Sequence, residues 1–322
     1  MVDMMLELSK IIRNVKHSRG SIDFDLPEIK VVLDEKLKVD HLEKRERGEA
    51  EKIIEDFMIE ANETVAEKLF WLEVPSIYRT HEKPDAERIQ ELNDVLGKFG
   101  YKVIFGSEGV HPKKFQSIIE DSQIKGISMI VHKMILMALK QARYTPENIG
   151  HFGLASSYYT HFTSPIRRYA DLMIHRILGA TLHGYPKQKY IDKLEKSLGT
   201  ICTAISKTER DAMKAEDESV KIKVVEYMLD KVGETFKGTI TGFASRKVFI
   251  ETEELVECMW DVTNSPHYYE FDEIEYAMVD KDNGAVYNLG DKIEIIVVRA
   301  DMAELEIEVA PYTEEFFTEI KK

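Results

Sequence analysis

The sequence has few cysteines and no long apolar run. Its 322 residues include two cysteines, Cys202 and Cys258, and neither belongs to a CxxC pair. A disulfide framework and a zinc finger are therefore not indicated, and a reducing compartment fits. The most apolar stretch, GISMIVHKMILMALK, is interrupted by a histidine and a lysine and is too short to span a bilayer. No signal peptide is recognisable, so we expect a cytoplasmic protein without a membrane partner.

Basic residues are scarce in the last quarter of the chain. The whole chain is 43% hydrophobic and 32% charged, with a net charge of -14, and its length suggests two globular domains. Residues 233–309 hold 18 acidic and 6 basic side chains, a net charge of -12, whereas residues 1–232 are nearly neutral. The first part can therefore form a local basic groove. The last part cannot be a strong general phosphate binder.

Hydrophobic periodicity predicts an α+β protein. It predicts helices over residues 2–16, 49–70, 84–99, 112–121, 125–144 and 187–230, a β-hairpin over 29–43, a short strand ending at Pro84, and another after the turn-rich residues 145–159. From Gly233 onward, alternating segments predict five strands that close into a small barrel of the OB type. We expect domains at residues 1–232 and 233–310, followed by a tail over 311–322.

The segment THFTSPIRRYADLMIHR, residues 160–176, combines an N-capping residue, a proline and two arginines. Ser164 fits the N-cap and Pro165 the first position of a helix that continues to residue 178. Arg167 and Arg168 would then lie in the first turn, where the helix dipole disfavours cations and favours a phosphate or carboxylate ligand. The alternative is an ordinary surface pair of either arginine with Asp171, worth about 0.3 kcal/mol.

These residues belong to a longer set of segments that resembles one family. HFGLASSYYTHFTSPIRRYADLMIHR resembles the signature of the ribonuclease II and ribonuclease R exoribonucleases, and RGSIDFDLPEIKVVLDE, IIEDFMIEANETVAE, YRTHEKP and LKQARYTPENIGHFGLA match the same family in the same order. The resemblance implies that residues 1–232 form the C-terminal part of an RNB-type catalytic domain. It also implies that residues 233–310 form an RNA-binding OB domain of the ribosomal protein S-one type.

The resemblance further implies processive hydrolysis of single-stranded RNA from its 3′ end, releasing nucleoside 5′-monophosphates with Mg²⁺. In that family a metal-activated water attacks the phosphodiester, and the metals and an arginine stabilise the phosphoryl charge. By similarity, Arg167 contacts the scissile phosphate in front of the turn at Ser164, and Ser164 and Arg168 are further RNA contacts. A guanidinium suits this task because it gives two hydrogen bonds to one phosphate.

Four further RNA-binding candidates follow from the resemblance. Glu55 matches a glutamate that holds a nucleotide sugar near the 3′ end, and Phe24 matches an aromatic residue that clamps stacked bases. Without the resemblance, Glu55 would be a solvated residue paired with Lys52, and Phe24 a core residue under the hairpin. In the barrel, Phe243 and Phe249 retain the aromatic side chains of the family, although its glycine-aromatic pattern is lost.

The chain lacks the family's metal-binding motif, DxxxxxDxDD. Asp23 and Asp25 are the closest pair of aspartates but lie in a different motif. His151, His161 and His175 lack the spacing of a helical zinc pair, so each is expected to form hydrogen bonds.

We therefore expect no metal ligand in this chain, with Mg²⁺ held by aspartates outside it, for example on a separate N-terminal half. The chain would be a C-terminal fragment, a split gene product or a decayed relative, inactive alone. One alternative is a non-catalytic RNA-binding or regulatory module. Another is an unrelated acidic interaction protein, although the family motifs that occur in order along the chain argue against it.

Overall fold

The computed structural model describes residues 1–24, 26–45, 47–107 and 109–312. The chain forms two compact units, Met1–Phe24 with Arg47–Met213 and Asp25–Glu46 with Lys214–Lys322. The boundary between them falls inside the long helix α7 (Gln188–Leu229), so these units do not coincide with a division at residue 233. The expected tail lies outside the described residues after Tyr312.

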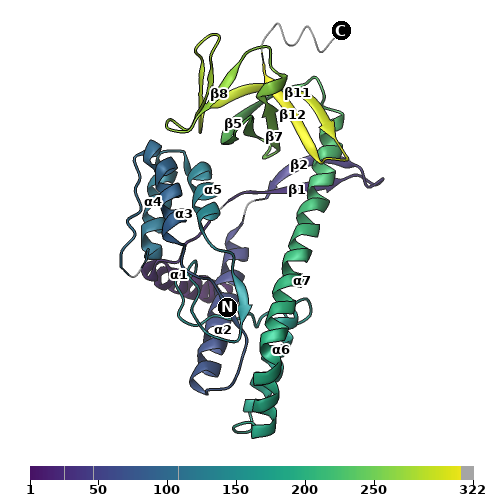
Figure 1. Cartoon of the computed structure of the whole chain (residues 1–322). Helices are drawn as coiled ribbons and strands as arrows, with labels where there is room; N and C mark the ends of the chain where they lie inside the picture. Colours follow the sequence, from purple (N-terminus) through teal and green to yellow (C-terminus); the bar gives the residue numbers. More distant parts are fainter. Residues whose placement is uncertain (25, 46, 108, 313–322) are drawn as a thin grey trace. The chain divides into compact units, whose positions relative to one another are not determined.

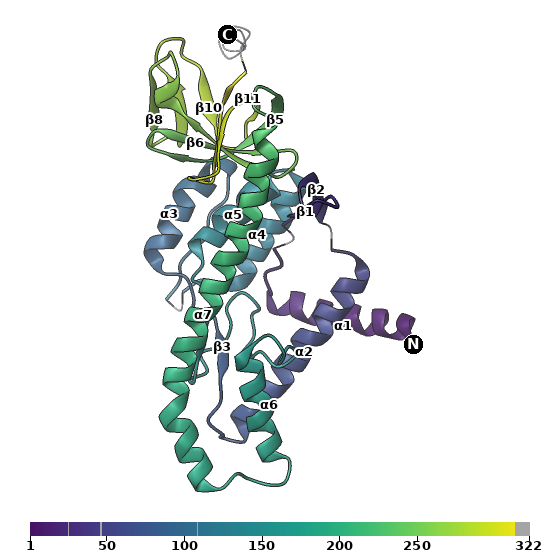
Figure 2. The same ribbon diagram turned by 90° about the vertical axis from the view of Figure 1, so that its right-hand side faces the viewer.

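The first unit is mostly helical (Figure 1). Its elements, besides the first part of α7, are α1 (Val2–Arg19), α2 (Glu49–Trp71), β3 (Tyr78–Thr80), α3 (Ala86–Leu96), the short 3₁₀ helix η1 (Gly97–Phe99), α4 (Pro112–Ile124), α5 (Ser128–Ala138), β4 (Arg143–Thr145) and α6 (Tyr169–Thr181). One apolar core lies among α3, α4 and α5 around Phe115 and Ile135. A second joins the end of α2 to α6 and the first part of α7, which lie side by side (Figure 2).

The helix expected over residues 125–144 is shorter than its apolar pattern suggests. It forms α5 and ends at Ala138, because Arg143–Thr145 pairs antiparallel with β3 instead. The strand expected after residues 145–159 does not form among the described residues before α6. Within residues 145–159, His151 and Ser156 form an isolated bridge. Tertiary strand pairing therefore overrides helical periodicity in this stretch.

The second unit holds the predicted hairpin and barrel. The hairpin pairs β1 (Glu28–Leu33) with β2 (Val39–Arg45), and its Ile29, Val31 and Leu42 pack on the apolar core of this unit. Five strands form a closed barrel in the order β11-β12-β7-β6-β5. Their bounds are β5 (Thr235–Ala244), β6 (Lys247–Thr252), β7 (Glu257–Asp261), β11 (Lys292–Asp301) and β12 (Glu306–Pro311). The closure between β12 and β7 is narrow, with a single parallel pair of Glu308 and Met259.

The second unit also contains elements that periodicity missed. A 3₁₀ turn, η2 (Val262–Asn264), follows β7, and then β8 (Tyr269–Asp272), β9 (Ala277–Asp280) and β10 (Val286–Asn288) form a three-stranded antiparallel sheet. These strands contain three or four residues each, too few for an alternating pattern to stand out. They are an insertion between the third and fourth strands of the barrel.

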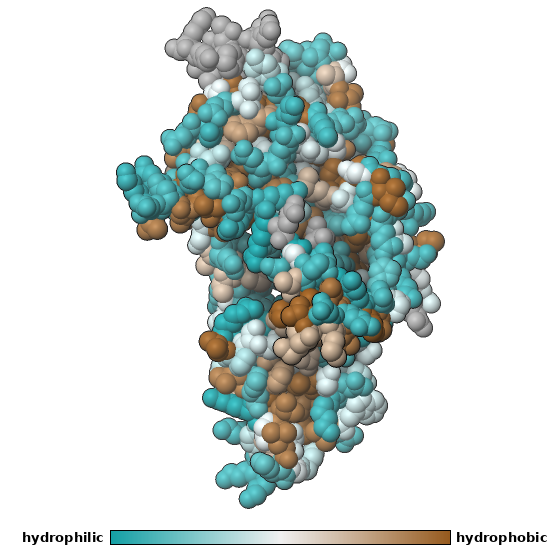
Figure 3. Space-filling view, turned by 180° about the vertical axis from the view of Figure 1, so that it is seen from behind, coloured by the Kyte–Doolittle hydropathy of each residue, from teal (hydrophilic) through white to brown (hydrophobic). Residues whose placement is uncertain are grey.

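Apolar side chains are exposed on several elements. Seen from behind, brown apolar patches lie among the teal polar side chains (Figure 3). On α1, the side chains of Met4, Leu8, Ile11 and Val15 are about half exposed or more and recur at helical spacing. No helix within the described part of the chain has the length and apolar character that crossing a membrane requires.

Candidate functional site

The turn before α6 is organised by a buried carboxylate. The Asp171 side chain, in the first turn of α6, is fully buried. Its Oδ1 accepts hydrogen bonds from the backbone N–H of Ser164 at 2.7 Å and from Arg168 Nη2 at 2.8 Å, and its Oδ2 accepts one from Arg168 Nε at 2.8 Å. The Arg168 N–H also donates to the Ser164 carbonyl at 3.1 Å, which closes the turn over residues 164–168.

This arrangement corrects the expected start of the helix. Arg168 is the N-cap of α6, with an extended backbone, so Ser164 and Pro165 lie in a separate turn before the helix. The reason is the Asp171 carboxylate, which binds the Ser164 N–H from inside the helix and draws the preceding chain into a turn. The pair of Arg168 with Asp171 does form, but it is a buried bidentate pair and not the weak surface contact of the alternative interpretation.

Arg167 has surroundings unlike those of its neighbour. The Arg167 side chain is exposed, and it makes no hydrogen bond or ion pair with any residue that the structure describes. The adjacent Ile166 is fully exposed. The turn therefore presents the Arg167 guanidinium to solvent while its base is fixed by Arg168 and Asp171, an arrangement suited to binding an external anion.

The segment leading into this turn is fixed to two other elements. The Arg79 N–H of β3 donates to the Tyr159 carbonyl at 2.9 Å, and Thr160 Oγ1 donates to the Ile77 carbonyl at 2.6 Å. From α2, Asn62 Oδ1 accepts from the Phe162 N–H at 2.9 Å. Asn62 is itself buried, so these contacts satisfy polar groups that would otherwise be costly to bury.

Burial holds two histidines of this region, His151 and His161, in their neutral form. Burial, followed by the nearby positive charge of Arg168, lowers the pKa of His161 to about 2. Burial and the neighbouring His81 likewise lower the pKa of His151 to about 3. His161 Nδ1 lies 2.7 Å from the Tyr144 hydroxyl. His175 Nε2 lies 2.9 Å from the Phe162 carbonyl. These histidines therefore form hydrogen bonds, as expected from the sequence.

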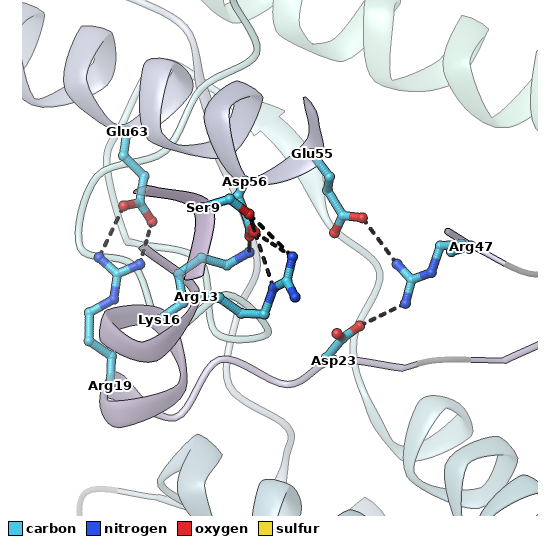
Figure 4. Close-up of polar contacts among 9 residues, drawn as sticks. All are labelled: Ser9, Arg13, Lys16, Arg19, Asp23, Arg47, Glu55, Asp56 and Glu63. Carbon is cyan, nitrogen blue, oxygen red and sulfur yellow. Dashed lines mark hydrogen bonds and ion pairs between the residues drawn. The ribbon is translucent and has the colours of Figure 1, made fainter. Parts of the chain in front are cut away.

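Glu55 lies on α2, seven residues before Asn62 and so on the same helix face. It is paired with Arg47, 3.2 Å from its Oε2, rather than with Lys52 as the ordinary interpretation suggested. Arg47 also contacts Asp23 at 3.0 Å, so it links the segment containing Asp23 to α2 (Figure 4). Because the Glu55 side chain is about 43% exposed, its carboxylate remains accessible.

The neighbouring Asp56 is buried and binds side chains of α1. Its side chain is 4% exposed and contacts Ser9, Arg13 and Lys16 of α1 at distances of 2.8–3.1 Å (Figure 4). Burial raises the pKa of Asp56, but the hydrogen bonds from Lys16 and Ser9 outweigh it, and the net shift is downward. Asp56 therefore clasps α1 to α2.

The aromatic candidates occupy two environments. Phe24 is partly buried against the core of α3, α4 and α5, with its ring centroid 5.9 Å from that of His132, so it packs on the helices and not under the hairpin. In the second unit, Phe243 packs against Phe271, at 5.6 Å between centroids, and is partly buried. Phe249 is 41% exposed. It is thus the barrel aromatic more available for stacking.

The acidic residues named so far do not form a magnesium site. Asp171 is occupied by Arg168, Asp56 by α1, and Asp23 and Glu55 by Arg47. Asp25 lies outside the described residues.

Among the described residues, one group of three side chains could hold a metal ion. It lies in the second unit and consists of His267, Asp280 and Asp282. Buried Asp280 already contacts His267 at 2.6 Å and accepts a backbone N–H from Asp282, so this group is an internal hydrogen-bond network.

Comparison with known proteins identifies the class. The sequence profile of the RNB domain matches residues 1–184, which is more than half of the chain. The chain therefore belongs to the RNB domain family. Within that family it is similar to ribonuclease R of Thermotoga maritima, with 40% identity over 307 residues, 94% of this chain and 43% of that protein. The chain spans 38–44% of the length of the first curated relatives that it matches.

Solved structures agree with this assignment. The RNase R of Mycoplasma genitalium in complex with ribose-methylated single-stranded RNA matches with a TM-score of 0.90 and 26% identity, over 97% of this chain and 49% of that one. Yeast Ssd1, described as a pseudonuclease, matches with a TM-score of 0.59 and 23% identity, over 72% of this chain and 29% of that one. The second likeness shows the fold alone.

Sequence reasoning missed the residues that hold the site together. Asn62 and Arg79 lie in segments that resemble the family and Arg47 does not, but no local pattern gives any of them a role, because each acts on a segment distant in sequence. Asp171 gave a weak signal through its spacing from Arg168. Its burial and its bond to Ser164 depend on tertiary structure, which spacing does not reveal.

Proposed function

We propose that this chain acts in hydrolytic 3′-to-5′ degradation of single-stranded RNA, as part of an exoribonuclease that releases nucleoside 5′-monophosphates. The observation that carries the proposal is the turn over residues 164–168, which presents an exposed Arg167 that has no hydrogen bond or ion pair with the residues that the structure describes. The RNA complex of the Mycoplasma relative supports RNA as the substrate class. Arg167 would donate two hydrogen bonds to the scissile phosphate and stabilise its charge as the bond breaks.

Other residues of the first unit would position the RNA. Glu55, oriented by Arg47, would accept hydrogen bonds from a sugar near the 3′ end. Phe24 would offer a ring edge or face to stacked bases, which suits degradation without base selectivity. Arg168 donates one N–H from Nε and one from Nη2 to Asp171, so the two N–H groups of Nη1 and the second N–H of Nη2 would remain for a secondary contact near Ser164.

The barrel of the second unit would be an OB-type RNA-binding domain following a catalytic part at residues 1–232. Phe249 would provide its main stacking surface and Phe243 would support the strand from within. Because residues 233–309 carry a net charge of -12, the electrostatic part of RNA binding would have to come from elsewhere.

Mg²⁺ would supply water activation for hydrolysis. Its ligands would come from aspartates outside this chain, for example on a separate N-terminal half, because the described residues of the first unit contain no group of three possible metal ligands. The two unpaired, buried cysteines fit a reducing, cytoplasmic setting.

The engaged acids also favour a second candidate, a non-catalytic RNA-binding or regulatory module. The likeness to a pseudonuclease is compatible with this because one fold can host active and inactive sites. An assay of the chain with Mg²⁺ and a uniformly labelled RNA, with and without a separately made half that carries the DxxxxxDxDD motif, tests both candidates.

We expect nucleoside monophosphates only from the mixture. In the mixture, Arg167→Lys should raise the barrier by about 2.7–4 kcal/mol, the cost of losing one preorganised transition-state donor, with a smaller loss of RNA affinity. Release by the chain alone would refute the need for outside ligands. No release from a verified complex of the two halves would favour the regulatory module.

A further inference from the structure

One side chain binds both ends of the closed turn before α6. Three groups that lie outside the body of α6, the Ser164 N–H and two guanidinium nitrogens of Arg168, converge on the Asp171 carboxylate. The carboxylate is fully buried and the Arg168 side chain is 18% exposed, so the pair is shielded from competing water and salt. All three contacts are 2.7–2.8 Å long, as expected for charge-assisted hydrogen bonds.

These contacts give the two adjacent arginines different tasks. Arg168 points inward to Asp171 and fixes the end of the turn, whereas Arg167 has no partner among the described residues and is exposed. Among the described residues, the side chains between the two anchors, Pro165 to Arg167, form no hydrogen bond or ion pair that would hold them. If Asp171 released the turn, the Arg167 guanidinium would sample many positions before it could meet a phosphate.

We propose that Asp171 is a positioning residue that acts through the turn over residues 164–168 to hold Arg167 ready for an RNA phosphate. A preorganised guanidinium loses less conformational entropy on binding, so the turn increases affinity without touching RNA itself. The RNA part of this inference rests on the proposed function. Closure of the turn by Asp171 does not, and it can be measured separately.

The first measurement is trypsin cleavage at Arg167 and Arg168 in the full chain, followed by mass spectrometry. The variant is Asp171→Asn, which keeps the shape of the side chain but removes its charge, and the matched control is Asp192→Asn on the exposed face of α7. We expect cleavage in the turn to become about tenfold faster in Asp171→Asn, because proteolysis follows local opening, and to stay unchanged in the control. Equal cleavage rates would overturn the inference.

The second measurement is fluorescence anisotropy of a 5′-labelled oligoadenylate in EDTA, which prevents hydrolysis. Arg167→Met should weaken binding about tenfold, the loss of one charge-assisted phosphate contact. Asp171→Asn should weaken it about fivefold alone but less than twofold in the Arg167→Met background, because the two residues act through one contact. A purely stabilising Asp171 would instead give additive losses, and additive losses would overturn the inference.

Two outcomes separate this inference from the proposed function. If Asp171→Asn leaves cleavage unchanged while Arg167→Met weakens RNA binding, this inference is overturned and the proposed function stands. If Arg167→Met leaves RNA binding unchanged while Asp171→Asn opens the turn, the phosphate contact fails and Asp171 remains only a brace for the turn, which overturns the positioning role.

If Asp171→Asn does not fold, Arg168→Met with Asp171→Leu removes both buried charges and retains apolar volume. That double variant should show the same faster cleavage and the same non-additive loss, and a closed turn in it would contradict the role of the pair.

Discussion

At the scale of single residues, burial decides which side chains respond to pH. His151 and His161 precede the turn that presents Arg167 in the sequence, and burial lowers their pKa values to about 3 and about 2. Both therefore stay neutral in the folded protein at any pH where it is expected to function. In the unfolded chain, histidines bind protons below about pH 6.5.

This difference predicts a loss of stability in mild acid. Because the unfolded state binds more protons below about pH 6.5, the free energy of unfolding falls as the pH decreases, by up to about 1.4 kcal/mol per pH unit for each histidine. His161→Gln, which can still bond Tyr144, should reduce that slope between about pH 5 and about pH 6.5 in urea titrations. The exposed His183→Gln serves as the control, and an equal change of slope in both variants would contradict the prediction.

At the scale of elements, α1 and α2 are joined through the buried Asp56. Its partners Arg13 and Lys16 are 34% and 13% exposed, so removing the carboxylate leaves charges that are partly shielded from water. Asp56→Asn should therefore lower the free energy of unfolding by about 3 kcal/mol, the lower end for breaking a buried pair.

Urea unfolding followed by circular dichroism measures this loss. Glu218→Gln, which removes an exposed pair with Lys214 on α7, should change stability by less than about 0.5 kcal/mol. Similar losses in the two variants would show that the Asp56 clasp contributes no more than a surface pair.

The elements also show where sequence reasoning succeeds. Long helices such as α2 and α7 and the five barrel strands carry strong periodicity, and they form close to the expected residues. The start of α6 and the end of α5 were misplaced because a distant partner competes with the local pattern: Asp171 captures the Ser164 N–H, and β3 pairs with Arg143–Thr145. Local propensity cannot include such partners.

The candidate site follows the same rule. Arg167 and Glu55 could be selected because they stand in motifs that resemble a family, and they remain predictions as RNA contacts. The residues that orient them, Asp171 and Arg47, act across turns or between segments. Their roles depend on tertiary geometry, which only the folded chain provides.

At the scale of the whole molecule, the distribution of charge should determine how it binds RNA. The net charge of -14 resides almost entirely in residues 233–309, whereas residues 1–232 are nearly neutral and carry the exposed Arg167. Phosphates near the acidic barrel are repelled, and salt screens that repulsion over about 8 Å at physiological ionic strength. In the proposed function, the barrel would therefore oppose RNA binding electrostatically even where its aromatic residues would favour it.

Neutralising acids on the barrel should thus strengthen RNA binding by the full chain. The test variant converts four exposed glutamates of the second unit to glutamine: Glu253, Glu254, Glu273 and Glu304. A charge-matched control converts four exposed glutamates of the first unit: Glu49, Glu51, Glu87 and Glu91. In anisotropy titrations of a labelled oligoadenylate at low salt, we expect the RNA affinity of the barrel variant to increase about threefold to tenfold. This gain should disappear at about 1 M salt, where the Debye length is about 3 Å.

If RNA contacts the barrel, the gain in affinity should exceed that of the control, since repulsion is strongest where phosphate lies close. An equal gain in both variants would mean that only net charge matters, and no gain in either would mean that stacking, not phosphate attraction, dominates binding.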